Sequence, residues 1–143
     1  MTLHLIKLCV GVETVQELRD WHKKKIAQRK RMKPPRLWHV TRMMPKQRDE
    51  ILDGGSLYWV IKGFVQVRQP IVDLEPMTDK EGIACCRIRL AEKLVLVTLA
   101  PHRPFQGWRY LKAADAPADL KAGVKHDDLP PALLKQLSEL GLA

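Results

Sequence analysis

Two strongly apolar runs in the middle of the chain constrain the fold most. Residues 57–61 read LYWVI, and residues 64–75 form a longer run that begins after Gly63. Aromatic and β-branched side chains at this density are typical of β-strands. We therefore expect the centre of the chain to consist of two strands, one of them long.

The longer run changes phase near residues 69–70. Its apolar residues stand at odd positions before Pro70 (65 and 67) and at even positions after it (72 and 74). A shift of one residue exchanges the two faces of a strand, so a bulge or bend near residues 69–70 would keep both halves directed into one core. Bends of this kind suit a small barrel.

Weaker patterns predict the remaining elements. Residues 3–10 predict a buried strand, and Thr14 with Glu17 fits a capping box for a helix that continues to about residue 31. The other expected elements are a strand over 36–43, a short helix over 46–52, strands over 84–90 and 94–99, a last short strand at the end of 101–111, and a helix over 130–140. At 143 residues one domain is expected. We predict a single α+β domain over residues 1–143, built as a small bent antiparallel or mixed β-barrel with flanking helices.

The positive charge is concentrated in one segment. The chain carries 25 Lys and Arg against 16 Asp and Glu, a net charge of +9, and residues 21–48 contain eleven basic residues and no acidic one. Such a segment attracts polyanions by releasing their counterions, which makes nucleic acid the expected partner. The alternative is a solvated helix end and loop that are rich in basic residues. The predicted phosphate contacts are Lys23, Lys24, Lys25, Arg29, Lys30, Arg31, Arg36 and Arg42.

Aromatic residues stand beside basic ones in several places, above all in residues 101–111. A flat ring close to a guanidinium can stack an unpaired base while the cation holds its phosphate, although most tryptophans in a chain of this size pack in the core. Trp108, between Gly107 and Arg109, is the strongest candidate for the mouth of a pocket. The full set of predicted pocket residues is Trp38, Tyr58, Arg103, Trp108 and Arg109.

Signals for catalysis are weak. Ser56 precedes a strand, which is the reverse of the strand-to-helix turn that carries a nucleophilic serine. Cys85 is expected to face outward beside Arg87 and Arg89, whose charge would lower the pKa of a reactive thiol. The histidines and cysteines show no metal-ligand spacing, and no phosphate-binding glycine motif is present. We predict no catalytic residue, metal or cofactor.

Two other function classes remain open. A small hydrolase or nucleotide-processing enzyme would use Cys85 or a histidine together with a carboxylate. A protein-interaction module would dock the leucine-rich helix over 130–140 on a partner.

The sequence favours a cytoplasmic location and no membrane contact. No apolar run approaches the roughly 20 residues that a membrane span needs. The first ten residues lack the basic start and small-residue cleavage site of a signal peptide.

Two stretches carry a family resemblance. Residues 39–63 (HVTRMMPKQRDEILDGGSLYWVIKG) and 103–111 (RPFQGWRYL) resemble a family of short bacterial proteins that is a domain of unknown function. The order of helix, glycine turn, aromatic strand and long bent strand is also similar to PUA-like domains, especially their EVE and ASCH branches. That second resemblance implies a pseudobarrel with RNA or a modified base bound in a cleft beside it.

Overall fold

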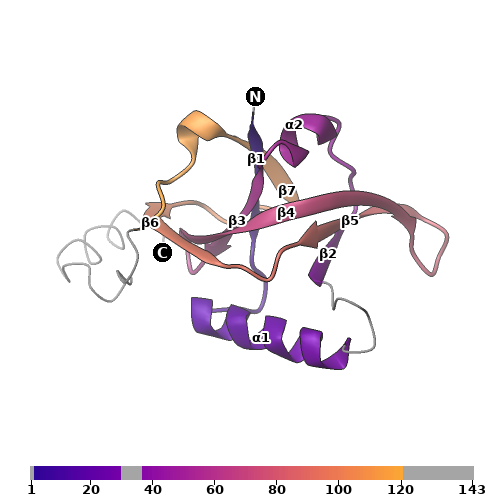
Figure 1. Cartoon of the computed structure of the whole chain (residues 1–143), viewed down its shortest axis with the longest axis horizontal. Coiled ribbons are helices and arrows are strands. Elements are labelled where there is room, and N and C mark those ends of the chain that lie inside the picture. The colour runs from indigo at the N-terminus through magenta and orange to yellow at the C-terminus, as the bar shows by residue number, and fades with distance from the viewer. Residues whose placement is uncertain (1, 30–36, 121–143) are drawn as a thin grey trace.

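In the computed structural model, which describes residues 2–29 and 37–120, the chain forms a mixed seven-stranded sheet with two helices (Figure 1). The helices are α1 (Val15–Gln28) and α2 (Arg48–Leu52), and a 3₁₀ turn covers Ala113–Asp115. The strands are β1 (Leu3–Leu8), β2 (Leu37–Thr41), β3 (Ser56–Ile61), β4 (Phe64–Thr78), β5 (Ala84–Leu90), β6 (Val95–Pro101) and β7 (Trp108–Lys112). The α+β class expected from the sequence is confirmed. The helix expected over 130–140 lies outside the described residues.

The long strand β4 organises the sheet. Its first half pairs with β3 on one edge and with β6 on the other, whereas its second half pairs with β5. Figure 1 shows β4 running across the whole molecule. The complete strand order is β2-β5-β4-β3-β1-β7, with β1 parallel to β3 and β6 beside β4. The two central runs of the sequence therefore form the antiparallel pair on which the other strands assemble.

The predicted change of phase in β4 occurs at Val72. The pairing with β5 shifts between Ile71 and Asp73, so that one residue of β4 is left over, as in a β-bulge. Ile71 and Leu74 are buried on either side of this shift, whereas Val72 is 52% exposed. The bulge was expected near residues 69–70 with Val72 facing the core. It lies two residues later, and Val72 is the residue that it turns outward.

The sheet is not closed, so the predicted barrel is wrong. Within the described chain, the edge strands β2 and β7 each pair with one neighbour, β5 and β1 respectively. The ends of the two edges nevertheless lie close together, because Thr41 at the end of β2 and Trp108 at the start of β7 line the same groove. Side-chain hydrogen bonds, described below, join these edges in place of a backbone ladder.

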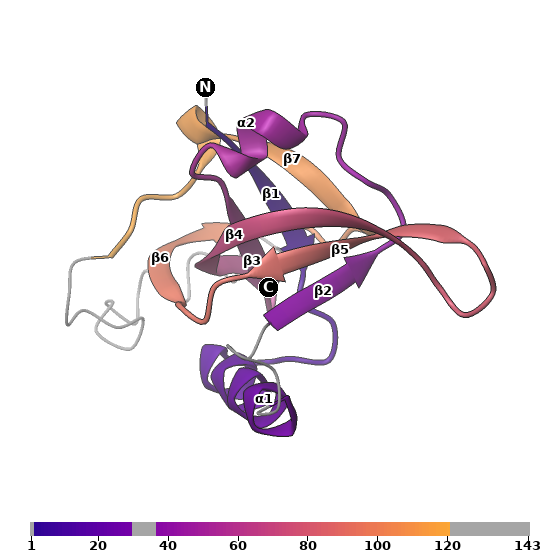
Figure 2. The ribbon, with the colours of Figure 1, turned by 45° about the vertical axis from the view of Figure 1, so that its right-hand side comes forward.

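The two helices lie at opposite ends of the sheet in both ribbon views (Figure 2). The start of α1 is fixed by the predicted cap: the Thr14 side chain accepts a hydrogen bond of 3.1 Å from the Glu17 N–H, and the Glu17 carboxylate accepts one from the Glu13 N–H. Within the described residues, neither helix is long and apolar enough to cross a membrane.

The core lies on both faces of β3, whose six residues are all buried. Leu57, Trp59 and Ile61 belong to the larger cluster, which includes Leu18 of α1 and Ile51 of α2. Tyr58 and Val60 point into a smaller cluster on the opposite face. An apolar residue at every position is the pattern of a strand buried on both sides.

Candidate functional site

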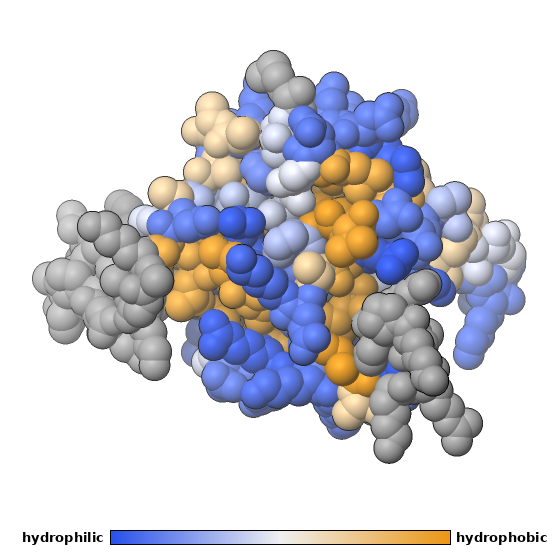
Figure 3. All heavy atoms as spheres, in the orientation of Figure 1, coloured by the Kyte–Doolittle hydropathy of each residue, from blue (hydrophilic) through white to orange (hydrophobic). Residues whose placement is uncertain are grey.

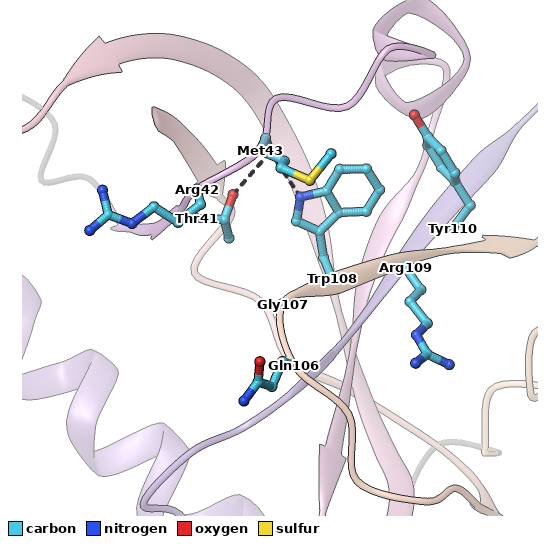
Figure 4. A pocket seen from close by; sticks show the side chains of 8 residues that line it. All are labelled: Thr41, Arg42, Met43, Gln106, Gly107, Trp108, Arg109 and Tyr110. Atoms are coloured by element: carbon cyan, nitrogen blue, oxygen red, sulfur yellow. Dashed lines mark hydrogen bonds between the residues drawn. The ribbon is translucent and has the colours of Figure 1, made fainter. Parts of the chain in front are cut away.

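The two stretches that carry the family resemblance meet in one groove. Its volume is about 500 Å³, and it lies between the loop that follows β2 and the start of β7 (Figure 4). We name it the Trp108 groove; its lining residues are Thr41, Arg42, Met43, Gln106, Gly107, Trp108, Arg109 and Tyr110. The two charged residues that line it are Arg42 and Arg109. The groove thus combines aromatic rings with positive charge.

Alternating side chains of β7 build one wall of the groove. Trp108 and Tyr110 share a face of the strand, with their ring centres 4.9 Å apart and their planes nearly perpendicular. The Trp108 indole N–H donates a hydrogen bond of 2.8 Å to the Met43 carbonyl, and the Tyr110 hydroxyl accepts hydrogen bonds from the backbone N–H groups of Lys46 and Gln47. These bonds fix the loop after β2 against β7.

Both arginines of the groove have partners of their own. Arg42 forms an ion pair of 2.8 Å with Asp79 in the turn between β4 and β5. Arg109 points to the other side of β7, where its guanidinium lies 4.8 Å from the centre of the Phe105 ring. Figure 4 shows both guanidinium groups directed away from Trp108. The groove therefore has cations at its edges rather than at its centre.

Three predicted pocket residues do not line the Trp108 groove: Trp38, which is described below, Tyr58 and Arg103. Tyr58 is 4% exposed and packs in the smaller core cluster, where the edge of its ring faces His4. Arg103 is exposed and does not line the Trp108 groove.

A second candidate region forms where the end of α1 meets β2 and β5. Two guanidinium groups lie over the Trp38 ring: the Cζ atom of Arg29 is 3.5 Å from the ring centre and that of Arg87 is 4.5 Å from it. Burial and the charge of Arg87 both lower the pKa of Arg29. A single indole thus holds two like charges close together.

The lysines of α1 extend this positive region. Lys23 and Lys24 are exposed, and Lys25 is half-buried with its ammonium group 5.4 Å from the centre of the Trp21 ring. Among the described residues, no carboxylate forms an ion pair with these lysines. Figure 3 shows hydrophilic residues over α1 at the lower edge of the molecule. We name this region the α1–β5 surface; it comprises Lys23, Lys24, Lys25, Arg29, Trp38 and Arg87.

The predicted phosphate contacts are thus only partly brought together. Arg42 belongs to the Trp108 groove instead of the α1–β5 surface. Lys30, Arg31 and Arg36 lie outside the described residues.

The cysteines and the serine of the described residues are buried. Cys85 was expected to face outward, which is wrong: it is 5% exposed and pairs with Met77 of β4. Burial raises the pKa of Cys86 to about 11 and that of Cys9 to about 12. Ser56 is buried, and its hydroxyl accepts a hydrogen bond from Arg68. The raised pKa values keep the thiols of Cys9 and Cys86 protonated at neutral pH.

Of the histidines in the described residues, His22 is buried, and His4, His39 and His102 are half-buried. Burial lowers the pKa of His22 to about 4, and burial together with the charge of Lys7 lowers that of His39 to about 4. His4 accepts a hydrogen bond from the Ser56 N–H. In residues 2–29 and 37–120, no hydrogen bond or ion pair joins a histidine to a carboxylate, and no three potential ligands cluster as a metal site would require.

Three residues that form contacts in the two candidate regions were not predicted from the sequence. Tyr110 was not among the predicted pocket residues, although its hydroxyl accepts hydrogen bonds from the loop opposite. Arg87 was assigned to Cys85 rather than to Trp38, because pairing between β2 and β5 is not visible in the sequence. Met43 carries no signal at all, since its backbone carbonyl makes the contact.

Comparison with known proteins identifies the family. No curated protein and no solved structure matches the chain. A family model described as "Protein of unknown function (DUF1489)" matches residues 5–143, which include both stretches that form the Trp108 groove. The chain therefore belongs to the family of proteins of unknown function DUF1489.

Proposed function

We propose that the chain is a non-catalytic module that binds nucleic acid on the α1–β5 surface and that RNA is its preferred ligand. The observation that carries the proposal is the stack of Arg29, Trp38 and Arg87 beside the lysines of α1. Two guanidinium groups close to one ring provide donors suited to the oxygens of a phosphate bound beside the stack. The exposed lysines would add contacts that do not depend on sequence.

The Trp108 groove is proposed to accept a base of the same polymer. Its aromatic wall suits stacking, and the arginines at its edges suit a neighbouring phosphate. The strand β2 connects the two regions, because Trp38 and Thr41 are three residues apart, about 10 Å along an extended chain. The similarity to PUA-like domains predicts the same class of ligand. The PUA-like fold stays a prediction, and so does the cytoplasmic location.

The test measures the fluorescence anisotropy of labelled ten-nucleotide RNA and DNA with protein freed of nucleic acid. The variant Arg87→Gln should weaken binding several-fold, because it removes one guanidinium from the stack. Arg103→Gln is the matched control, since Arg103 is an exposed arginine outside the α1–β5 surface. Equal affinities of both variants and the unchanged protein would refute the assignment of this surface.

A further inference from the structure

A pocket lies between the end of β1, the first half of α1 and β2. Its volume is about 310 Å³, at the lower end of the roughly 300–1,000 Å³ that is usual for small-molecule sites. None of its lining residues belongs to the Trp108 groove or to the α1–β5 surface. We name it the His39 pocket; its lining includes Lys7, Cys9, Val12, Leu18, Trp21 and His39.

Lys7 brings a positive charge to this pocket. Alternation along β1 directs its side chain to the same face as Leu5, which is fully buried in the larger core cluster. Lys7 itself is half-buried, and within the described parts of the chain its ammonium group forms no ion pair. Every other residue of the lining is uncharged at neutral pH. The pocket therefore holds one cation without a carboxylate to balance it.

The ring of His39 borders the same pocket. Its centre is 4.7 Å from that of the Trp59 ring in the core and 5.3 Å from that of the Trp21 ring. Burial and the charge of Lys7 lower the pKa of His39 to about 4, so the ring is neutral at pH 7, with one nitrogen that donates and one that accepts. Because Lys7 and Trp21 both act on this ring and both line the pocket, the side chain of His39 faces the pocket.

The ring nitrogens of His39 are available to a ligand. In residues 2–29 and 37–120, neither of them makes a hydrogen bond. The two nitrogens of His22 are buried without a partner, whereas those of His39 are not among the buried unpaired atoms. A group in the pocket can thus form the hydrogen bond that the protein itself leaves unmade.

These groups fit a small aromatic carboxylate. The single charge of Lys7 matches one negative charge, whereas a phosphate monoester carries nearly two. The N–H of His39 can donate to a carboxylate oxygen. Trp21, together with Leu18 and Val12, forms an apolar wall against which a flat ring packs well.

We propose that the His39 pocket binds a small aromatic monocarboxylate, with Lys7 and His39 holding the carboxylate and Trp21 packing against the ring. Binding is reversible, because burial raises the pKa of Cys9 to about 12 and keeps its thiol protonated. The site is independent of the proposed nucleic-acid surface, since Trp38 and His39 are neighbours in β2 and their side chains leave opposite faces of the strand.

Isothermal titration calorimetry at pH 7 with 2-naphthoate and 2-naphthamide separates charge from shape, because the two probes share one ring system. The unchanged protein should bind one 2-naphthoate about tenfold more tightly than the amide, since hydrogen bonds to charged groups are the stronger ones. Octanoate, which has the charge but no ring, should bind more weakly than 2-naphthoate. Equal affinity for 2-naphthoate and 2-naphthamide, or no binding of 2-naphthoate, would overturn the proposal without the use of any variant.

Variants then assign the bound probe to the pocket. Lys7→Gln should remove the advantage of 2-naphthoate over 2-naphthamide, and His39→Phe, which keeps a ring but has no N–H, should weaken 2-naphthoate several-fold. Lys80→Gln, at an exposed lysine in the turn between β4 and β5, should keep the advantage, and so should Arg87→Gln on the α1–β5 surface. Thermal unfolding checks that each variant is folded. An advantage that survives Lys7→Gln, or that is lost in Arg87→Gln, would contradict the proposal.

Discussion

The indole N–H of Trp108 donates a hydrogen bond of 2.8 Å to the carbonyl oxygen of Met43, a residue 65 positions earlier in the chain. This bond crosses the gap between the two edge strands of an open sheet. Two residues further along β7, Tyr110 binds the same loop through its hydroxyl. The walls of the Trp108 groove are therefore fastened to each other by side chains, and the groove is formed before any ligand arrives.

Tyr110→Phe should lower the free energy of unfolding by about 1 kcal/mol, because the backbone N–H groups of Lys46 and Gln47 lose their acceptor. Urea unfolding measures this difference. Lys46→Ala is the control: it removes a side chain but keeps the backbone donor, and should have little effect. Equal stability of Tyr110→Phe and the unchanged protein would show that the hydroxyl contributes nothing.

Gly55→Ala should destabilise the protein by about 3 kcal/mol. A Cβ atom at this position would collide with the carbonyl oxygens of Leu3 and Ile51, which are backbone atoms and cannot move aside. Gly11 is the comparison, because its φ of 78° strains an alanine but nothing lies within 4 Å of the added atom. Gly11→Ala should therefore cost only about 1 kcal/mol. Similar losses in the two variants would contradict the packing described around Gly55.

The protein should lose stability as the pH falls from about 6.5 to about 4. In the folded protein the pKa values of His22 and His39 are about 4, below the ordinary 6.5, so these rings stay neutral while the unfolded chain takes up protons. Between the two values, protonation favours the unfolded state. The two neutral rings make their full contribution to the free energy of unfolding above about pH 6.5. This contribution is lost as the pH falls toward 4.

Urea unfolding at pH 7 and pH 4.5 checks the histidine assignment. His22→Phe should show a smaller loss between the two pH values than the unchanged protein, because only His39 and His4, whose pKa burial and the charge of Arg68 also lower, then contribute among the described histidines. An identical loss in both proteins would mean that the buried ring of His22 is not responsible.

The thiols of the native protein should react slowly with Ellman's reagent. Cys9, Cys85 and Cys86 are all less than 10% exposed, and burial raises the pKa of Cys9 and Cys86. All three should react quickly once the protein is unfolded in guanidinium. Rapid reaction of one thiol in the folded protein would instead support the alternative of a thiol-dependent enzyme.

Local patterns predicted most of the elements. The Thr14 cap, the strand at residues 57–61 and the long strand after Gly63 are formed as expected, because burial and capping act over a few neighbouring residues. The bulge was misplaced by two residues, since Ile71 and Val72 are equally apolar and only pairing with β5 decides which one faces the core.

The pairing of strands that are far apart in the chain could not be predicted from the sequence. The open sheet depends on β7 joining β1 at the far edge from β2, and no local pattern specifies that choice. The same limit applies to the candidate site. Trp108 was correctly singled out by its unusual surroundings, whereas the contact of Trp38 with Arg87 requires a register between two strands that lie nearly fifty residues apart.

The central claim is that the lysines of α1 bind nucleic-acid phosphates, and the salt dependence of RNA binding tests it most directly. For single strands, the slope of log K against log salt changes by about 0.7 for each phosphate contact. Replacing Lys23, Lys24 and Lys25 by glutamine should therefore flatten the slope by about 2. Replacing Lys46, Lys80 and Lys112, three exposed lysines elsewhere on the molecule, should leave it unchanged although the net charge falls equally. An unaltered slope in the first variant, or the same flattening in both, would contradict the account.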